Sequence, residues 1–364
     1  MTSKSTLRGK RIGSGIALML LLIPCADRLR AKSRPDTAVT ALNQSVNPFT
    51  AALEPTPPSA VFKMPRSYLW DPSIIHAGNT YYLFASHWPS SKGFGDWEHS
   101  DVIVATSQHL LGPYSYRRVV LKARPGKWDS RGIANPKILK VGRHYLLYYL
   151  GLPRFQTGFA IADSINGPWK RFNKPTIATN NPALWIHHNG SAYAVGKVKV
   201  RLRRHGTVHD FLQAYTARNW RGPYKPFGAK PDALPGHDEL EDPTIWYANG
   251  QYNLICTDWK SRATGIFKAG AYYFSRTGRR YHLVSRIPIF NRFKPFHFSD
   301  GSVVTFSRIE RPQVVLNQKH QVTALLLAVL PKSGNSYILI EPVNDYYPPE
   351  FYNTDSDTHG VAPR

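Results

Sequence analysis

The stretch Asp71-Pro72-Ser73-Ile74-Ile75, followed by Gly78-Asn79 and then Thr80-Tyr81-Tyr82-Leu83-Phe84, decides the fold because the chain repeats its pattern. A polar residue and a proline open an apolar run, a short turn follows, and a second apolar run comes next. Two apolar runs joined by a turn of this composition predict a β-hairpin.

The same pattern begins at four further X-Pro pairs. The five prolines are Pro72, Pro136, Pro182, Pro243 and Pro312, which are 64, 46, 61 and 69 residues apart. Most units continue with a third run that leads to a Gly-Pro-aromatic turn, so each offers about four strands, as a propeller blade does. We therefore predict an all-β chain that forms a five-bladed β-propeller. A β-sandwich is the competing fold, and it does not explain the recurring X-Pro starts.

The composition divides the 364 residues into four parts. Residues 1–25 join a basic segment to the apolar run Ile12–Ile23, as in a signal peptide; an uncleaved anchor and a lipoprotein-like leader lipidated at Cys25 are the alternatives. Residues 26–60 are expected to be a disordered linker, 61–345 the propeller and 346–364 a C-terminal tail. The protein is therefore expected to be secreted or to lie in the cell envelope (periplasm), and to meet a membrane only through its leader.

The charge of the chain is strongly positive. Lys and Arg number 47 against 23 Asp and Glu, a formal net charge of +24, of which +19 belongs to residues 61–364. Such a field attracts polyanions, and an adaptation of solubility or habitat is the alternative. No nucleic-acid motif accompanies the charge, and the export signal argues against that partner.

Cysteines and motifs exclude several other classes of chemistry. Cys25 lies in the leader and Cys256 in an apolar run, so no disulfide is expected within the propeller. The sequence has no phosphate loop, nucleophile elbow or zinc spacing. No cofactor is expected to be required, with a structural Ca²⁺ as the alternative, and a monomer is expected.

The residues before the five prolines are expected to share one pocket. Innermost propeller strands surround a central channel, so the residues that start them converge at one mouth. Those residues are Asp71, Asn135, Asn181, Asp242 and Arg311. An Asx turn before proline is the structural alternative for any single one, but five polar residues in one register favour a site.

These motifs resemble glycoside hydrolase family 43 and its five-bladed relatives, such as families 32 and 117. The resemblance rests on Asp71-Pro72 and Glu241-Asp242-Pro243 with the hairpins that follow them, and it covers about residues 65–345. It implies that Asp71 is the general base and Glu241 the general acid. The second-blade carboxylate that tunes the acid in that group is replaced by Asn135, which leaves the role to Asp129, Asp242 or Glu310, or implies altered or lost activity.

The residue types suit glycosidic cleavage. One carboxylic acid protonates the leaving oxygen while an ionised carboxylate activates water on the opposite face of the sugar. We expect hydrolysis of a plant or algal polysaccharide or oligosaccharide, inverting as the resemblance implies, and on a sulfated or uronic glycan as the charge indicates. A non-catalytic carbohydrate-binding propeller is the alternative; a transfructosylase would need an Arg-Asp-Pro motif in mid-chain that is missing.

Aromatic residues near the blade starts are candidates for substrate binding. Trp70, Trp88 and Trp259 are predicted to stack on sugar rings, with His87 beside them, whereas Trp185 and Trp246 are expected in the core. The adjacent His187 and His188 point to opposite faces of a strand, so metal binding is the weaker interpretation.

Basic residues are candidates for contact with an anionic group. The alternating run Lys197 to Arg203 places Lys197, Lys199, Arg201 and Arg203 on one strand face, either as an anion-contacting ladder or as a charged outer edge. Arg131, Lys197 and Arg311 are the predicted direct contacts, because paired hydrogen bonds suit planar anions.

Overall fold

The computed structural model describes residues 39–40, 46–201, 208–228 and 239–352. The chain divides into Met1–Asp36 and Thr37–Arg364, and the fold belongs to the second unit. The expected leader, Cys25 with its lipidation and residues 26–38 and 41–45 of the expected linker lie outside the described residues, as do Arg203 and most of the expected tail. Among the described residues, no helix is long and apolar enough to cross a membrane.

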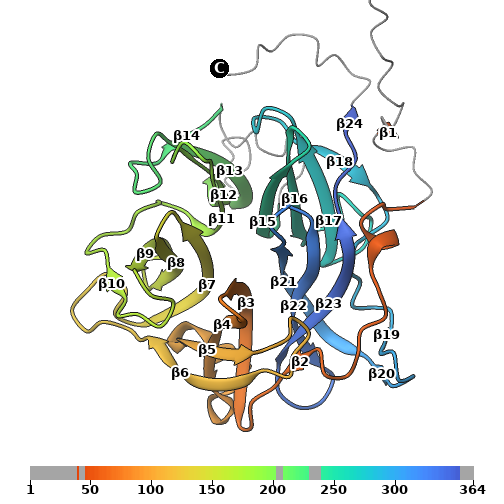
Figure 1. Cartoon of the computed structure of the whole chain (residues 1–364), viewed down its shortest axis with the longest axis horizontal. Helices are drawn as coiled ribbons and strands as arrows, with labels where there is room; N and C mark the ends of the chain where they lie inside the picture. The colour runs from red at the N-terminus through yellow and green to blue at the C-terminus, as the bar shows by residue number, and fades with distance from the viewer. Residues whose placement is uncertain (1–38, 41–45, 202–207, 229–238, 353–364) are drawn as a thin grey trace, which may run out of the picture. The chain divides into compact units, whose positions relative to one another are not determined.

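Five four-stranded antiparallel sheets form the predicted five-bladed β-propeller (Figure 1). The first blade contains β3 (Ser67–Ala77), β4 (Thr80–Pro89), β5 (Asp101–Ser107) and β6 (Ser115–Leu121). The second contains β7 (Gly132–Val141), β8 (His144–Leu152), β9 (Gln156–Ala162) and β10 (Lys170–Arg171). In each of these blades the strands follow one another outward from the centre.

The third blade contains β11 (Asn180–Ile186), β12 (Ala192–Arg201), β13 (Val208–Ala217) and β14 (Lys225–Pro226). The fourth contains β15 (Leu240–Ala248), β16 (Gln251–Asp258), β17 (Ala269–Ser275) and β18 (His282–Ser285). The fifth contains β21 (Phe306–Leu316), β22 (Val322–Pro331) and β23 (Tyr337–Tyr346). Its outermost strand is β2 (Val61–Phe62), which comes from the start of the propeller and pairs with β23.

Short elements complete the description. The pairs β1 (Val39–Thr40) with β24 (Phe351–Tyr352) and β19 (Phe296–His297) with β20 (Val303–Val304) form two small sheets. Three 3-10 helices are Thr50–Ala52, Ser90–Lys92 and Phe94–His99.

Part of the expected linker is packed structure, which corrects the prediction for residues 46–60. The Phe49 side chain is fully buried and contacts the rings of Trp246, Tyr272 and Tyr346. On the C-terminal side Phe351 is also fully buried, against Tyr272 and Phe274. The composition of 26–60 is polar on average, but Phe49 together with the bridges Leu53–Val343 and Thr56–Phe298 holds its last part on the propeller.

The two Asn-Gly hairpin turns, at 189–190 and 249–250, differ in backbone conformation. Asn249 and Gly250 both have positive φ, 52° and 73°, as the Asn-Gly pair predicts. At Asn189-Gly190 only the glycine is left-handed, with φ 81°. Trp246 and Cys256 lie fully in the core as expected, whereas Trp185 is only partly buried and contacts the His320 ring.

Candidate functional site

The five residues that precede the prolines of the blade starts, called the ring residues from here on, share one backbone feature. Each innermost strand, β3, β7, β11, β15 and β21, has a register shift at its X-Pro pair. The residue before the proline has positive φ in every case: Asp71 54°, Asn135 51°, Asn181 46°, Asp242 57° and Arg311 61°. A left-handed arginine is not an Asx turn. A repeated left-handed bulge therefore turns five polar side chains towards one mouth of the channel, where such strain is typical of functional sites.

A cavity of about 840 Å³ opens at this mouth. Asp71, Asn181, Glu241 and Arg311 line it, so residues from four blades meet there. Its volume lies in the range of small-molecule sites in proteins. The prediction that Asp71 and Glu241 face a common site is confirmed by this geometry.

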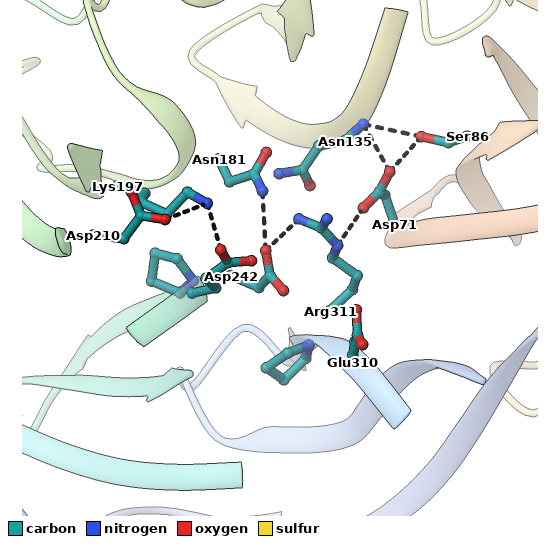
Figure 2. A network of polar contacts seen from close by, with 12 residues as sticks. Asp71, Ser86, Asn135, Asn181, Lys197, Asp210, Asp242, Glu310 and Arg311 are labelled. Atoms are coloured by element: carbon teal, nitrogen blue, oxygen red, sulfur yellow. Dashed lines mark hydrogen bonds and ion pairs between the residues drawn. The ribbon is translucent and has the colours of Figure 1, made fainter. Parts of the chain in front are cut away.

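Asp71 is buried and firmly held (Figure 2). Its Oδ2 accepts hydrogen bonds from Ser86 Oγ at 2.6 Å and from the backbone N–H of Asn135 at 3.0 Å. Its Oδ1 makes an ion contact with Arg311 Nε at 3.0 Å and has no hydrogen bond within the described residues. The carboxylate is thus held at both oxygens, by hydrogen bonds at Oδ2 and by the Arg311 guanidinium at Oδ1.

Arg311 bridges two carboxylates of the ring. It pairs with Asp71 through Nε and with Asp242 through Nη1, and these two acids raise its pKa although burial alone would lower it. Asp242 is 2% exposed, and its Oδ1 also accepts a hydrogen bond from Asn181 Nδ2 at 3.0 Å. Burial raises the pKa of Asp242 to about 7, with Arg311 opposing the rise and Glu241 adding to it.

Glu241 forms an ion pair with Lys197 of β12. The same ammonium lies 3.3 Å from Asp210 Oδ2 on β13. Burial acts to lower the pKa of Lys197, but the attraction of Glu241 and Asp210 outweighs it and the pKa is raised. Lys197 therefore remains a cation, and its contact must open before Glu241 can donate a proton elsewhere.

Asn135 enters the site through its backbone. Its N–H holds Asp71, and its side chain does not line the cavity. Asp129, one of the alternatives for the tuning carboxylate, is fully buried between Arg124 and Arg171 outside the cavity. Glu310 lines the cavity but pairs with Lys268 and Arg308. Among these candidates, Asp242 is the carboxylate that Arg311 connects to Asp71 through ion pairs.

The predicted aromatic contacts differ in their exposure. Trp88 is 1% exposed and Trp70 4%, and both pack against Phe94 while lining the cavity. That they stack on a sugar ring stays a prediction. Trp259 lines the cavity half-buried, with the Lys268 ammonium 3.5 Å above its ring.

Two predicted binding residues lie outside the cavity. His87 follows Ser86 on β4 and therefore points to the opposite face, where its Nε2 lies 3.1 Å from Ser67 Oγ. Burial lowers its pKa. Arg131 is exposed and pairs with Glu98 at 2.7 Å. The repeat pattern does not predict the His87–Ser67 or the Arg131–Glu98 contact. These contacts depend on the path of the loops and on which face of the strand each side chain occupies.

The basic run is an inner strand, which excludes the edge-strand alternative. β12 lies between β11 and β13, and Lys197 and Lys199 both line the cavity. Lys197 is committed to carboxylates, whereas the Lys199 side chain is 72% exposed and lies 3.8 Å from Asp210.

Several cavity residues were not predicted from the sequence. Ser86, Trp97, Arg154 and Phe155 line it, and no repeated position marks them. Lys137 lies in the channel, 3% exposed, and donates a hydrogen bond to the Pro243 carbonyl at 2.8 Å. Burial lowers its pKa to about 7. The sequence could have indicated this position, because Lys137 lies two residues after Asn135 on an innermost strand and is therefore expected to face the same side. Within the described ranges, no three His, Cys, Asp or Glu side chains gather as a metal site would require.

Comparison with known proteins shows that the fold is similar to those of solved glycoside hydrolases. No protein-family model matches the chain. A family 117 glycoside hydrolase of Zobellia galactanivorans is similar with a TM-score of 0.56 and 17% identity, over 83% of this chain and 93% of that one. A GH43 enzyme of Xanthomonas citri, solved with xylose, is similar with a TM-score of 0.54 and 15% identity, over 85% and 97%. These likenesses confirm the predicted fold.

A curated relative is similar in sequence over a shorter region. An extracellular endo-α-(1→5)-L-arabinanase of Thermotoga petrophila is 32% identical over 111 residues, which are 28% of this chain and 23% of that protein. The match thus spans about a quarter of the relative's length. The resemblance to family 43 and its propeller relatives is confirmed by these neighbours, which are glycoside hydrolases.

Proposed function

We propose that this chain is a glycoside hydrolase that cleaves a plant or algal polysaccharide by general acid/base catalysis. The observation that carries the proposal is that Asp71 and Glu241 line one cavity, with Arg311 joining Asp71 to Asp242, the residue next to Glu241. The glycosidase names of the similar proteins support it. Carboxyl groups from the first and fourth blades approach a bound sugar from different sides, as hydrolysis requires.

The roles follow from the contacts of each carboxylate. Asp71, ionised and held by Ser86, accepts a proton from a water molecule, whose oxygen then bonds to the anomeric carbon. After its contact with Lys197 opens, Glu241 takes up a proton from solvent and gives it to the leaving glycosidic oxygen. Asp242 takes the place of the missing second-blade carboxylate, since its proton is exchanged near pH 7. Such groups contribute roughly 10²–10⁴-fold in rate.

The experiment compares Asp71→Asn and Glu241→Gln with wild type on linear arabinan, the substrate class that the curated relative's name supplies. We expect each variant to lose about 10²-fold or more in kcat. Asp163→Asn, an exposed carboxylate paired with His144, is the matched control and should retain full activity. Wild-type turnover in either site variant would overturn the assigned roles. Proton NMR of the first-formed anomer tests inversion, which rests on the resemblance.

The finer proposal is an anionic glycan. Arg154 is exposed at the cavity and makes no ion pair with any described residue, and Lys199 is largely exposed beside it in the lining. Arg311 and Lys197, the residues predicted for this contact, are instead committed to carboxylates. We therefore assign the contact to Arg154 and Lys199. Matched sulfated and desulfated, or uronate-bearing and neutral, oligosaccharides at low and high salt test it: KM should be lower on the anionic member and rise with salt.

A non-catalytic carbohydrate-binding propeller is the second candidate. It is favoured by the Glu241–Lys197 ion pair, which occupies the proposed acid, and by Asn135 in place of a carboxylate. Calorimetry with oligosaccharides separates the two: binding without any turnover, unchanged by Glu241→Gln, would select this candidate.

A further inference from the structure

The outer edges of the first and second blades carry a continuous basic face. Residues 115–127, which include β6, contain Arg117, Arg118, Lys122, Arg124 and Lys127 and no acidic residue. Residues 164–175, which include β10, contain Lys170, Arg171 and Lys174 and no acidic residue. We name these two segments the basic flank.

Three hydrogen bonds from arginine side chains hold the two segments side by side. Arg118 donates to the Asn166 carbonyl at 2.5 Å, and Arg171 donates to the Lys122 carbonyl at 2.7 Å. Arg124 donates to the Phe172 carbonyl at 3.1 Å. The flank therefore belongs to two neighbouring blades, whose outer strands β6 and β10 are seen at the lower left of Figure 1.

The carboxylate between the segments is already used. Asp129 is fully buried and neutralised by Arg124 at 2.9 Å and Arg171 at 3.3 Å. The four lysines Lys122, Lys127, Lys170 and Lys174 are exposed, and none of them is in a salt bridge with a described residue. Asp101, near Lys122, and the exposed Asp163 are the neighbouring carboxylates, and the eight cations of the flank outnumber them and Asp129. Such an excess of positive charge attracts a polyanion.

One exposed aromatic residue lies within the flank. Tyr116 on β6 is 44% exposed, between Ser115 and Arg117. An open aromatic ring among cations offers stacking to a sugar ring in addition to charge. A surface that binds lipid headgroups through charge alone does not need such a stacking contact, so Tyr116 favours a sugar ligand.

We propose that the basic flank is a second, non-catalytic binding surface for an acidic polysaccharide chain, separate from the cavity at the mouth of the channel. The choice of polysaccharide over other polyanions rests on the proposed function. Exposed charges spaced over two blades suit an extended chain with one carboxylate per sugar, because several weak contacts on one polymer add up through effective concentration.

The test measures binding of the full chain to polygalacturonate by affinity electrophoresis, which needs no catalysis. A flank variant changes Lys122, Lys127, Lys170 and Lys174 to Gln. A control variant of equal charge changes the exposed Lys225, Lys294, Lys319 and Lys332 to Gln. We expect the flank variant to bind about tenfold more weakly, because each exposed charge contributes roughly two-fold, and the control variant to bind like wild type. Tyr116→Ala should weaken binding on its own.

Each outcome decides the proposal. Equal weakening in both quadruple variants, or no binding by wild type, overturns it. Tighter binding to duplex DNA or to phosphatidylserine vesicles than to polygalacturonate also overturns it in favour of that partner. Hydrolysis of short oligosaccharides should be the same in both variants. The two proposals can also be told apart. If the variants bind as expected but neither wild type nor any variant hydrolyses oligosaccharides, the proposed function is overturned and the proposed binding surface is retained.

Discussion

Arg311 holds Asp71 of the neighbouring first blade, with its Nε 3.0 Å from the carboxylate Oδ1, while its Nη1 is paired with Asp242. A guanidinium can contact two separate carboxylates at once because its donors form a rigid fork, which an ammonium cannot reproduce. The orientation of Asp71 is therefore tied to the charge on Asp242, although the two residues lie on different blades.

The first prediction is that Arg311→Lys lowers kcat by about 10²-fold, because a misplaced general base loses most of its catalytic contribution. Arg131→Lys, at an exposed pair with Glu98, is the control and should leave kcat unchanged. Steady-state kinetics gives the readout, and thermal melting separates loss of activity from unfolding, since breaking a buried ion pair is costly. Normal kcat in a folded Arg311→Lys protein contradicts the bridging role.

The second prediction compares two lysines of one strand. Lys197→Met removes the ammonium that contacts Glu241, whereas Lys199→Met removes one that lies 3.8 Å from Asp210 and is mostly exposed. We expect Lys197→Met to shift the pH dependence of kcat/KM, since the proposed acid loses its charged partner. Lys199→Met should keep the wild-type pH profile and raise KM on an anionic substrate alone. Identical pH profiles for wild type and both variants would exclude Lys197 as the partner of the acid.

The third prediction concerns stability and pH. Burial raises the pKa of Glu341, in the middle of β23, from 4.5 to about 8. A raised carboxyl pKa means that the folded state binds a proton which the unfolded state has released between these pH values. Stability is thus full below pH 4.5 and falls as the pH rises to about 8, by up to about 1.4 kcal/mol per pH unit.

Glu341→Gln should remove this loss. Urea denaturation of wild type and variant at pH 5 and pH 8 measures it, and the variant should show the smaller difference between the two pH values. An equal difference in both proteins would mean that Glu341 does not titrate in this range.

The fourth prediction concerns the packed end of the expected linker. Phe49→Ala should lower the free energy of unfolding by about 3–5 kcal/mol, the usual cost of truncating a buried phenylalanine. Val46→Ala, at a side chain that is 52% exposed, is the control and should cost little. Chemical denaturation gives both values. A negligible effect of Phe49→Ala would show that the segment contributes nothing to the stability of the propeller.

The ring was predictable because it depends on the backbone alone. An X-Pro pair at one register of five similar hairpins fixes where Asp71, Asn135, Asn181, Asp242 and Arg311 lie, whatever their side chains do. The ion pairs among them depend on how far each side chain reaches across the channel, and nothing in a strand pattern encodes that distance. Asn135 illustrates the limit, since it serves Asp71 through a backbone N–H that any residue would supply.

The surroundings of the predicted binding residues depend on tertiary packing. Trp88 lines the cavity and is packed against Tyr68 and Phe94, and its Nε1 donates to the Gly93 carbonyl. The sequence pattern around an aromatic residue near a site is the same whether the side chain packs in the cavity wall or stacks on a sugar ring. The strand β2 has only two residues, too few for any periodicity to reveal it.

The pairing of β2 with β23 affects the order in which the site forms during folding. The ribosome makes Val61 and Phe62 before any other part of the ring, but their partner strand β23 is made last. Long-range strand pairing of this kind is slow and can begin only when both partners are present. Asp71 is made early, Glu241 later and Arg311 nearly at the end, so no truncated nascent chain holds the full set. Activity should therefore arise in one step during folding, when β23 of the fifth blade pairs with β2.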